Sequence, residues 1–261
     1  MDLYIRRTGE YRGPSMVFLH GGGVAGWMWD RQAEFFRDYH VIIPDLPGHG
    51  RSADIPFISM NDAASKVLTA VRDVVGTEKV ILVGFSLGGQ LAVEILSRWP
   101  EKVEAAVILS AMVRPVNTGR TFLISLLKKS FGLVRVEWFS KWQAKSLYIP
   151  DAYWEQYYRD SLKLTRDNFL SVMEANMSYA LPETFANSNV PALVLAGTKE
   201  RGKVKASVRD MVRANRNCTG YLVAGAGHGL PLADPDLFNE MVYNFINNIR
   251  LHKNAKLKRV V

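Results

Sequence analysis

The sequence Gly84-Phe85-Ser86-Leu87-Gly88-Gly89 follows the apolar run Lys79–Val83 and precedes a stretch, 87–98, with the apolar spacing of a helix. A serine between glycines at a strand-to-helix junction is the pattern G-x-S-x-G. The glycines are needed because flanking side chains would clash in the sharp turn that carries the serine. This turn pushes the Ser86 hydroxyl out of the sheet, beside the N–H of Leu87 at the positive end of a helix. Ser86 is therefore a candidate nucleophile and Leu87 a candidate oxyanion donor, the alternative being an ordinary glycine turn.

Short apolar runs recur along the chain, and each is followed by a turn signal. Between them lie helical stretches such as 63–75 and 87–98, so the pattern indicates βαβ units. Units of this kind build a mostly parallel sheet with helices on both faces, which makes the fold class α/β. The six runs are Ser15–Leu19, Val41–Pro44, Lys79–Val83, Val103–Leu109, Ala192–Ala196 and Gly220–Val223.

The alternation stops between residues 112 and 186, where the pattern is helical. Residues 131–160 contain nine aromatic side chains, although the chain average of 11% predicts about three. We interpret the segment as a helical cap over a pocket that Trp138, Trp142 and Trp154 help to line; an ordinary helical subdomain is the alternative. The chain then divides into a core in two parts (1–111 and 187–249), a cap (112–186) and a basic tail (250–261).

The first strand-like run leads into His20-Gly21-Gly22-Gly23, whose backbone is flexible enough to approach Ser86. The N–H of Gly22 is therefore a candidate second oxyanion donor, with the N–H of Gly23 as a further candidate. Gly23 and Trp27 follow closely enough to line the pocket entrance, although Trp27 suits the buried face of a helix equally well.

A competing pattern overlaps this loop. Gly21-Gly22-Gly23-Val24-Ala25-Gly26 matches G-x-G-x-x-G, and Asp45 follows 19 residues after Gly26, as in dinucleotide-binding folds. We disfavour this interpretation because it leaves Ser86 and His228 without roles.

His228 follows the last strand-like run, on a loop that can reach the edge of the sheet where Ser86 lies. A general base there would take the Ser86 proton and later return it to the leaving group. Glu200, three residues past the Gly197 that follows the run Ala192–Ala196, is the candidate acid that orients His228. The alternative for Glu200 is a surface glutamate in the polar run 199–205.

The composition excludes several classes of protein. The chain has 261 residues, of which 48% are hydrophobic, and a single cysteine, which excludes a disulfide scaffold and a cysteine-rich zinc module. No apolar stretch reaches the roughly 18 residues of a spanning helix, and the first residues lack a signal-peptide pattern. We expect a cytoplasmic protein.

The formal net charge of +8 is unevenly distributed. Residues 111–150 carry seven basic residues and one acidic residue, and residues 250–261 carry five basic residues and no acid. The excess positive charge thus lies in one internal segment and one terminus. A nucleic-acid-binding domain is expected to carry a basic face within its fold, so this distribution argues against a nucleic-acid partner. Apolar residues at helical spacing lie beside two lysines within 122–129, as in an interfacial helix. Contact with an anionic membrane surface is the less favoured interpretation; the favoured one is that these apolar residues cover the pocket.

With these residues in place, the sequence resembles the α/β-hydrolase superfamily, in its lid-bearing, esterase-like branch. The resemblance implies an eight-stranded, mostly parallel sheet, a helical cap inserted after the sixth strand, and no cofactor or metal. It also implies that Asp45 structures a loop, and it makes Glu200 a departure because this position is more often aspartate. The motifs that carry it are His20-Gly21, 44–52, 84–89, Gly227-His228 and Asp234-Pro235.

We therefore expect a serine hydrolase that cleaves small or medium carboxylic esters through an acyl-enzyme on Ser86, with His228 as base and Glu200 as acid. One alternative is the same triad acting on a thioester or a carbon–carbon bond, or in a lyase-type reaction. The other is a receptor-like protein of this fold that binds a ligand with little turnover. Acyl and alcohol specificity and the oligomeric state stay open.

Overall fold

The elements are taken from a computed structural model that describes residues 2–249, 251 and 256–260. Within these residues the strands are β1 (Ile5–Gly9), β2 (Ser15–Leu19), β3 (His40–Pro44), β4 (Val80–Phe85), β5 (Val103–Leu109), β6 (Ala192–Gly197), β7 (Cys218–Val223) and β8 (Leu257–Val260). The α-helices are α1 (Asp30–Phe35), α2 (Met60–Val75), α3 (Leu87–Arg98), α4 (Arg120–Ser130), α5 (Glu137–Ser146), α6 (Trp154–Lys163), α7 (Arg166–Ser178), α8 (Gly202–Ala214), α9 (Leu230–Ala233) and α10 (Pro235–Ile246). Short 3-10 helices are η1 (Gly26–Trp29), η2 (Gly50–Ser52), η3 (Pro100–Lys102), η4 (Phe131–Arg135), η5 (Asp151–Tyr153) and η6 (Glu183–Asn187).

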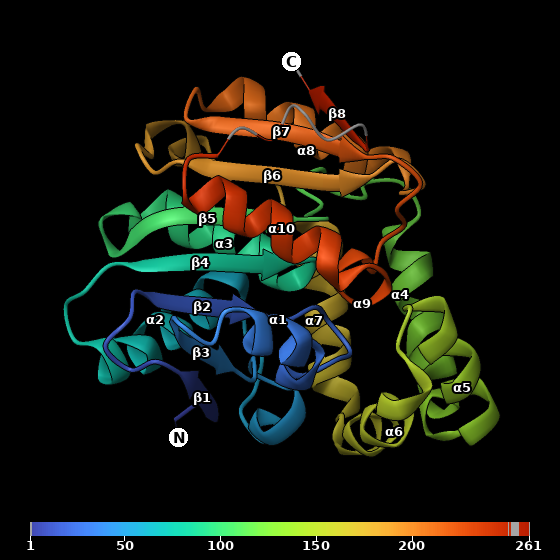
Figure 1. Ribbon diagram of the computed structural model, residues 1–261. Coiled ribbons are helices and arrows are strands. Elements are labelled where there is room, and N and C mark those ends of the chain that lie inside the picture. The colour runs from blue at the N-terminus through green and yellow to red at the C-terminus, as the bar shows by residue number, and fades with distance from the viewer. Residues whose placement is uncertain (1, 250, 252–255, 261) are drawn as a thin grey trace.

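The described strands form one eight-stranded sheet in the order β1-β3-β2-β4-β5-β6-β7-β8 (Figure 1). The six inner strands are parallel, and the edge strands β1 and β8 pair antiparallel with β3 and β7. All six strands predicted from the apolar runs are present, and the α/β fold class is confirmed. Because the inner strands are parallel, the loops that follow β2, β4, β6 and β7 meet at one edge of the sheet.

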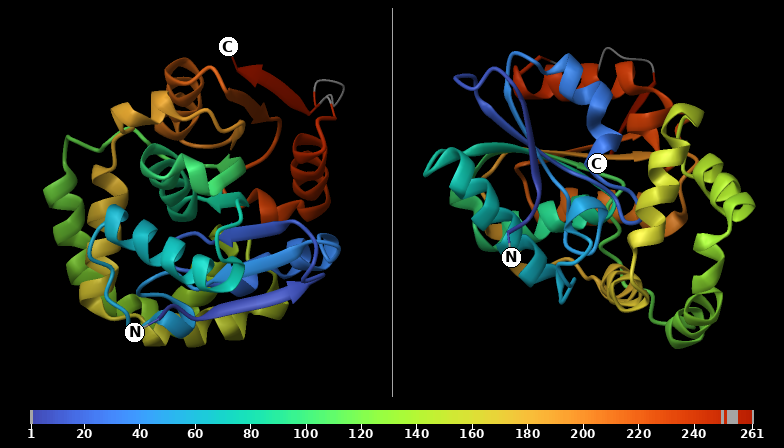
Figure 2. Two further views of the ribbon diagram at one scale, coloured as in Figure 1. Left: turned by 90° about the vertical axis from the view of Figure 1, so that its left-hand side faces the viewer. Right: turned by 90° about the horizontal axis from the view of Figure 1, so that it is seen from below.

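Helices cover both faces of the sheet (Figures 1 and 2). Alternate residues of each inner strand belong to different core clusters, as the period of two in a strand requires. One cluster packs against α2, α3 and α8, and the other against η1, α1 and α10. The inner strands are therefore buried on both sides, which explains their almost continuous apolar sequences.

Between β5 and β6 the chain forms only helical elements, from α4 to η6. We call residues 112–186 the helical insertion; its helices α5 and α6 lie beyond the carboxyl ends of the strands (Figures 1 and 2). The resemblance implied an insertion after the sixth strand, but in the structure the insertion follows the fifth strand of the chain. The count differs because the eighth strand of this sheet is supplied by the C-terminal segment, as β8, and not by a further strand before the insertion.

The basic tail contributes a strand to the sheet. Residues 257–260 pair with β7 as β8, with Val260 buried and Lys258 and Arg259 exposed. The pairing satisfies backbone groups of β7 that would otherwise form an open edge, and the outward charges protect the new edge. Arg250 and Lys253 lie outside the described residues.

The apolar residues of α4 do not line the cavity that contains Ser86. None of its eleven residues, all described, is buried, and Phe122 and Leu126 are 72% and 52% exposed. Of its apolar residues, Ile124 and Leu127 are half-buried, and the helix contacts α7, with which Ile124 lines a second pocket. Among the described helices, none is long and apolar enough to cross a bilayer. Contact with an anionic membrane surface stays a proposal, which co-sedimentation with anionic and neutral vesicles at low salt would test.

Buried polar contacts fix the insertion on the core. The Gln90 side chain of α3 donates to the carbonyl oxygens of Met112 (2.7 Å) and Asn176 (3.0 Å), and its own oxygen accepts from the Asn176 amide. The indole N–H of Trp27 donates to Asp160 of α6 at 3.0 Å. The Gln90 contacts thus fix the start of the insertion and α7 on α3, and the Trp27 contact fixes α6 on η1.

Candidate active site

Ser86 occupies a strained turn between β4 and α3. Its backbone has φ of 53° and ψ of −111°, a left-handed conformation that is costly for a residue with a Cβ. The turn is held by a hydrogen bond from the Ser86 N–H to the Leu109 carbonyl at 2.9 Å. A Cβ on Gly84 would lie 2.3 Å from the Gly88 carbonyl oxygen, and one on Gly88 would lie 2.2 Å from that of Leu19. Glycine is therefore required at both positions, for the steric reason that the sequence indicated.

The structure brings Ser86, His228 and Glu200 into one line of hydrogen bonds. The Ser86 Oγ lies 3.0 Å from Nε2 of His228, and Nδ1 of His228 lies 2.8 Å from Oε2 of Glu200. These residues are 28 to 142 positions apart in the sequence, and they meet because β4, β6 and β7 all end at the same edge of the sheet. Because an ionised carboxylate accepts only, Nδ1 is the protonated nitrogen, and Nε2 is left to accept from the serine.

Glu200 is buried, with a side chain only 2% exposed. Burial alone would raise its pKa, but hydrogen bonding to His228 and the charge of His228, together with donors from Ser110 and Gly197, bring that pKa below its ordinary value. Ser110 follows β5 directly, and its hydroxyl donates to Oε1, the oxygen that His228 does not use. Glu200 is thus not the surface glutamate of the alternative interpretation.

The glycine loop after β2 lies against the turn that carries Ser86. The Gly88 N–H donates to the His20 carbonyl at 3.0 Å, and a Cβ on Gly22 would lie 3.8 Å from the Leu87 side chain. Leu87 is the first residue of α3, where the N–H has no acceptor within the helix. Gly22 therefore lies against the Leu87 side chain, and a Cβ on the preceding Gly21 would lie 3.6 Å from the Cβ of Ser86.

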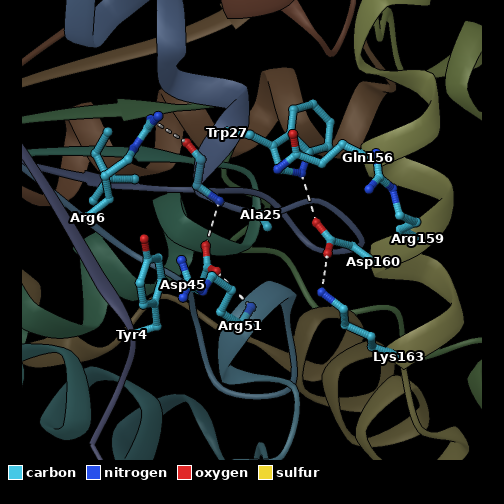
Figure 3. A pocket seen from close by; sticks show the side chains of 12 residues that line it. Tyr4, Arg6, Ala25, Trp27, Asp45, Arg51, Gln156, Arg159, Asp160 and Lys163 are labelled. Atoms are coloured by element: carbon cyan, nitrogen blue, oxygen red, sulfur yellow. Dashed lines mark hydrogen bonds and ion pairs between the residues drawn. The ribbon is translucent and has the colours of Figure 1, made fainter.

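The carboxylate of Asp45 is engaged by the chain's own backbone. Its oxygens accept from the N–H of Gly26 and of Arg51, both at 2.8 Å (Figure 3). A dinucleotide-binding fold needs this carboxylate for a ribose hydroxyl. Asp45 here ties two loops together, as the resemblance implied. Among the described residues, no group of three or more His, Cys, Asp or Glu side chains could hold a metal ion.

Two further histidines of the expected motifs are buried structural groups. Nε2 of His20 accepts from the Leu46 N–H at 2.9 Å, and Nδ1 of His49 lies 2.9 Å from the Pro47 carbonyl oxygen. Burial lowers the pKa of each to about 4, with the neighbouring His20 adding to the effect on His49. Both rings are therefore neutral around pH 7.

This burial predicts a loss of stability in mild acid. Because each pKa is lower in the folded chain than in the unfolded chain, protons bind the unfolded state preferentially between about pH 6.5 and pH 4. Stability is complete above that window and is lost as the pH falls through it, by on the order of 3 kcal/mol per histidine. Urea unfolding at pH 7 and pH 4.5 measures the loss, and His49→Gln should show a smaller one. An equal loss in wild type and variant would contradict the assignment to His49.

A cavity of about 390 Å³ opens beside Ser86 and His228. From the insertion and the segment leading into it, the lining includes Met112, Ser146, Tyr148 and Asn176; from the loop after β6 and the start of α8 it includes Lys199, Glu200, Arg201 and Val204. Tyr148 packs directly over the His228 loop, since a Cβ on Gly227 would lie 2.2 Å from its hydroxyl oxygen. The insertion thus supplies one wall of the cavity.

The five residues predicted to line the pocket, all within the described ranges, lie elsewhere. Trp138 and Trp142 are 67% and 63% exposed on α5, and the Trp154 ring stacks on Tyr158 within the insertion. Gly23 has open space around it. Trp27 is buried, stacks on Tyr153, and lines a separate cleft beside α6 (Figure 3). The helical pattern and the aromatic content predicted a cap but not which side chains face the serine.

Sequence reasoning missed Ser110 and Tyr148. A serine that directly follows the strand Val103–Leu109, at the edge where the other site loops meet, was the available signal for Ser110. Tyr148 carried no such signal, because its position depends on the turn after α5, where its φ is 60°.

Comparison with known proteins gives several relatives that span most of the chain. The 2-hydroxy-6-oxononadienedioate/2-hydroxy-6-oxononatrienedioate hydrolase of Klebsiella pneumoniae is 25% identical over 274 residues, covering 94% of this chain and 91% of that protein. Carboxylesterase YbfK of Bacillus subtilis is 27% identical over 262 residues, covering 93% and 83%. The chain is thus similar both to an esterase and to a hydrolase of another substrate class.

Solved structures agree on the fold. The enol-lactonase from Burkholderia xenovorans superposes with a TM-score of 0.79 at 19% identity, covering 94% of this chain and 96% of that one. At the level of sequence, the model of the alpha/beta hydrolase family matches residues 16–241, a range that includes Ser86, Glu200 and His228. This chain therefore belongs to the alpha/beta hydrolase family.

Proposed function

We propose that the chain is a serine hydrolase that cleaves small or medium carboxylic esters through an acyl-enzyme on Ser86. The observation that carries the proposal is the hydrogen-bonded line from Ser86 through His228 to Glu200, at 3.0 and 2.8 Å. A nucleophile and base within hydrogen-bond reach, with the base oriented by a third group, is the arrangement that activates a serine. We assign the two oxyanion donors that the reaction needs to the N–H groups of Gly22 and Leu87.

In the proposed reaction Ser86 Oγ attacks the ester carbonyl while Nε2 of His228 takes the hydroxyl proton. The N–H groups of Gly22 and Leu87 stabilise the oxyanion of the tetrahedral intermediate. His228 then donates the proton to the departing alcohol, which leaves the acyl group on Ser86. A water molecule, activated by His228, attacks the acyl-enzyme, releases the acid and restores the serine. Glu200 holds the His228 ring and stabilises its protonated form.

Hydrolysis of a carbon–carbon bond is the second candidate, favoured by the Klebsiella relative. The same three residues would serve, with a ketonised substrate in place of the ester. We favour the ester because it needs no proton transfer to carbon. A ligand-binding protein with little turnover is the alternative from another class.

The test uses 4-nitrophenyl acetate, butyrate and octanoate together with a fluorophosphonate probe. We expect turnover of at least one ester and one probe molecule bound per chain, located at Ser86 by peptide mapping. Labelling at Ser86 without turnover of any ester would favour the carbon–carbon or another substrate class. No labelling and no turnover would overturn the proposal and favour a ligand-binding protein.

A further inference from the structure

The segment 199–205, which spans the loop after β6 and the start of α8, concentrates positive charge near the cavity that contains Ser86. Four basic residues occur in seven positions: Lys199, Arg201, Lys203 and Lys205. They surround the first residues of α8, which has no acidic residue in its first turn. Positive charge at a helix N-terminus opposes the macrodipole, so helix stability does not account for this pattern.

The four cations are used differently. Lys203 and Lys205 donate to the backbone carbonyls of Pro115 (2.6 Å) and Thr198 (3.0 Å). Among residues 2–249, 251 and 256–260, the side chains of Lys199 and Arg201 have no hydrogen bond, ion pair or ring contact. These two, and neither Lys203 nor Lys205, line the cavity that contains Ser86.

Within the described residues, the cavity lining contains no free carboxylate that could pair with Lys199 or Arg201 in place of a ligand. Glu200 is the one carboxylate in its described lining, and His228 and Ser110 already occupy its two oxygens. The remaining polar lining consists of neutral groups such as Ser146, Tyr148 and Asn176. A ligand carboxylate at this rim would therefore meet two unpaired cations and the positive end of α8.

We infer that Lys199 and Arg201 form a subsite for a carboxylate on the acyl part of the substrate, so that the natural substrate is a monoester of a dicarboxylic acid. The inference rests on the proposed function, because it names the substrate class of the same site. The scissile carbonyl lies at Ser86, and the chain of the acid extends along the cavity past Glu200 to the two cations. The subsite supplies binding at a distance from the reacting bond, so its main effect is on KM.

The experiment compares mono(4-nitrophenyl) adipate with its neutral counterpart, methyl 4-nitrophenyl adipate, at low salt. We expect kcat/KM for the anion to exceed that for the neutral ester by about tenfold, since hydrogen bonds to charged groups are the stronger class. The double variant K199Q/R201Q should lose this preference by raising KM for the anion alone. Lys203→Gln, which removes one charge from the same segment outside the cavity, is the control and should retain the preference. Added salt should reduce it.

A second measurement does not depend on turnover. Isothermal titration calorimetry should show that monomethyl adipate binds the Ser86→Ala variant. The same titration of a variant that combines Ser86→Ala with K199Q/R201Q should show no binding. Equal kcat/KM for the two esters, or binding and preference unchanged in K199Q/R201Q, would overturn the subsite while leaving the hydrolase intact. If neither ester turns over and the probe does not label Ser86, the proposed function fails instead, and calorimetry then decides on the subsite alone.

Discussion

Replacement of Ser86 by alanine is expected to lower kcat for the best 4-nitrophenyl ester by about 10⁴- to 10⁶-fold. The variant keeps the turn, the oxyanion donors and the cavity but lacks the atom that forms the acyl-enzyme. What remains is the activity of the oxyanion donors and of binding alone. Steady-state kinetics on freshly purified variant, with active-site titration of the wild type, measures the difference.

The cavity supplies a matched control for this substitution. Ser146 also lines it, but its hydroxyl donates to the Gln143 carbonyl at 2.7 Å and takes no part in the line to His228. Ser146→Ala should stay within a fewfold of wild type, whereas Ser86→Ala should also lose all fluorophosphonate labelling. A Ser86→Ala variant that retains a tenth of the wild-type rate would exclude Ser86 as the nucleophile.

The fold and the position of Ser86 were predictable because their causes are local. The sharp turn at 84–89 admits only glycine at two positions, and such steric demands are visible in the sequence. The six inner strands are buried on both faces, so each is a continuous apolar run bounded by turn residues. The approach of His228 and Glu200 to Ser86 then follows from the common edge at which parallel strands end.

Other features depend on tertiary contacts that leave no local pattern. β8 consists of Leu257–Val260, and its two central residues are charged, so it was indistinguishable from a solvated tail until paired with β7. Trp138 and Trp142 were indistinguishable from pocket residues because aromatic content does not fix which way a helix faces. The contact of Ser110 with Glu200 joins residues 90 positions apart.

Glu200→Gln is expected to lower kcat by about 10⁴-fold while leaving the fold intact. Glutamine has nearly the same shape, but its amide is neutral and can donate to Nδ1 of His228. The ring would then carry its proton on Nε2, where it faces Ser86 and can no longer accept from the hydroxyl. The loss of charge also removes the stabilisation of protonated His228 during attack. Kinetics over the ester panel, with circular dichroism as a check on folding, tests the expectation, and a variant near wild type would exclude Glu200 as the acid.

Ser110→Ala separates the position of Glu200 from its charge. The hydroxyl of Ser110 is one of the donors that hold the pKa of Glu200 below its ordinary value. Without that donor the carboxylate persists, so we expect kcat to fall by about tenfold, far less than in Glu200→Gln. The pKa of Glu200 should rise, because its charged form loses a hydrogen bond. NMR titration of the Glu200 carboxyl group measures this rise directly. A titration curve that overlays the wild type would show that His228 and Gly197 alone keep the carboxylate ionised, whereas a raised pKa would assign part of that role to the buried serine after β5.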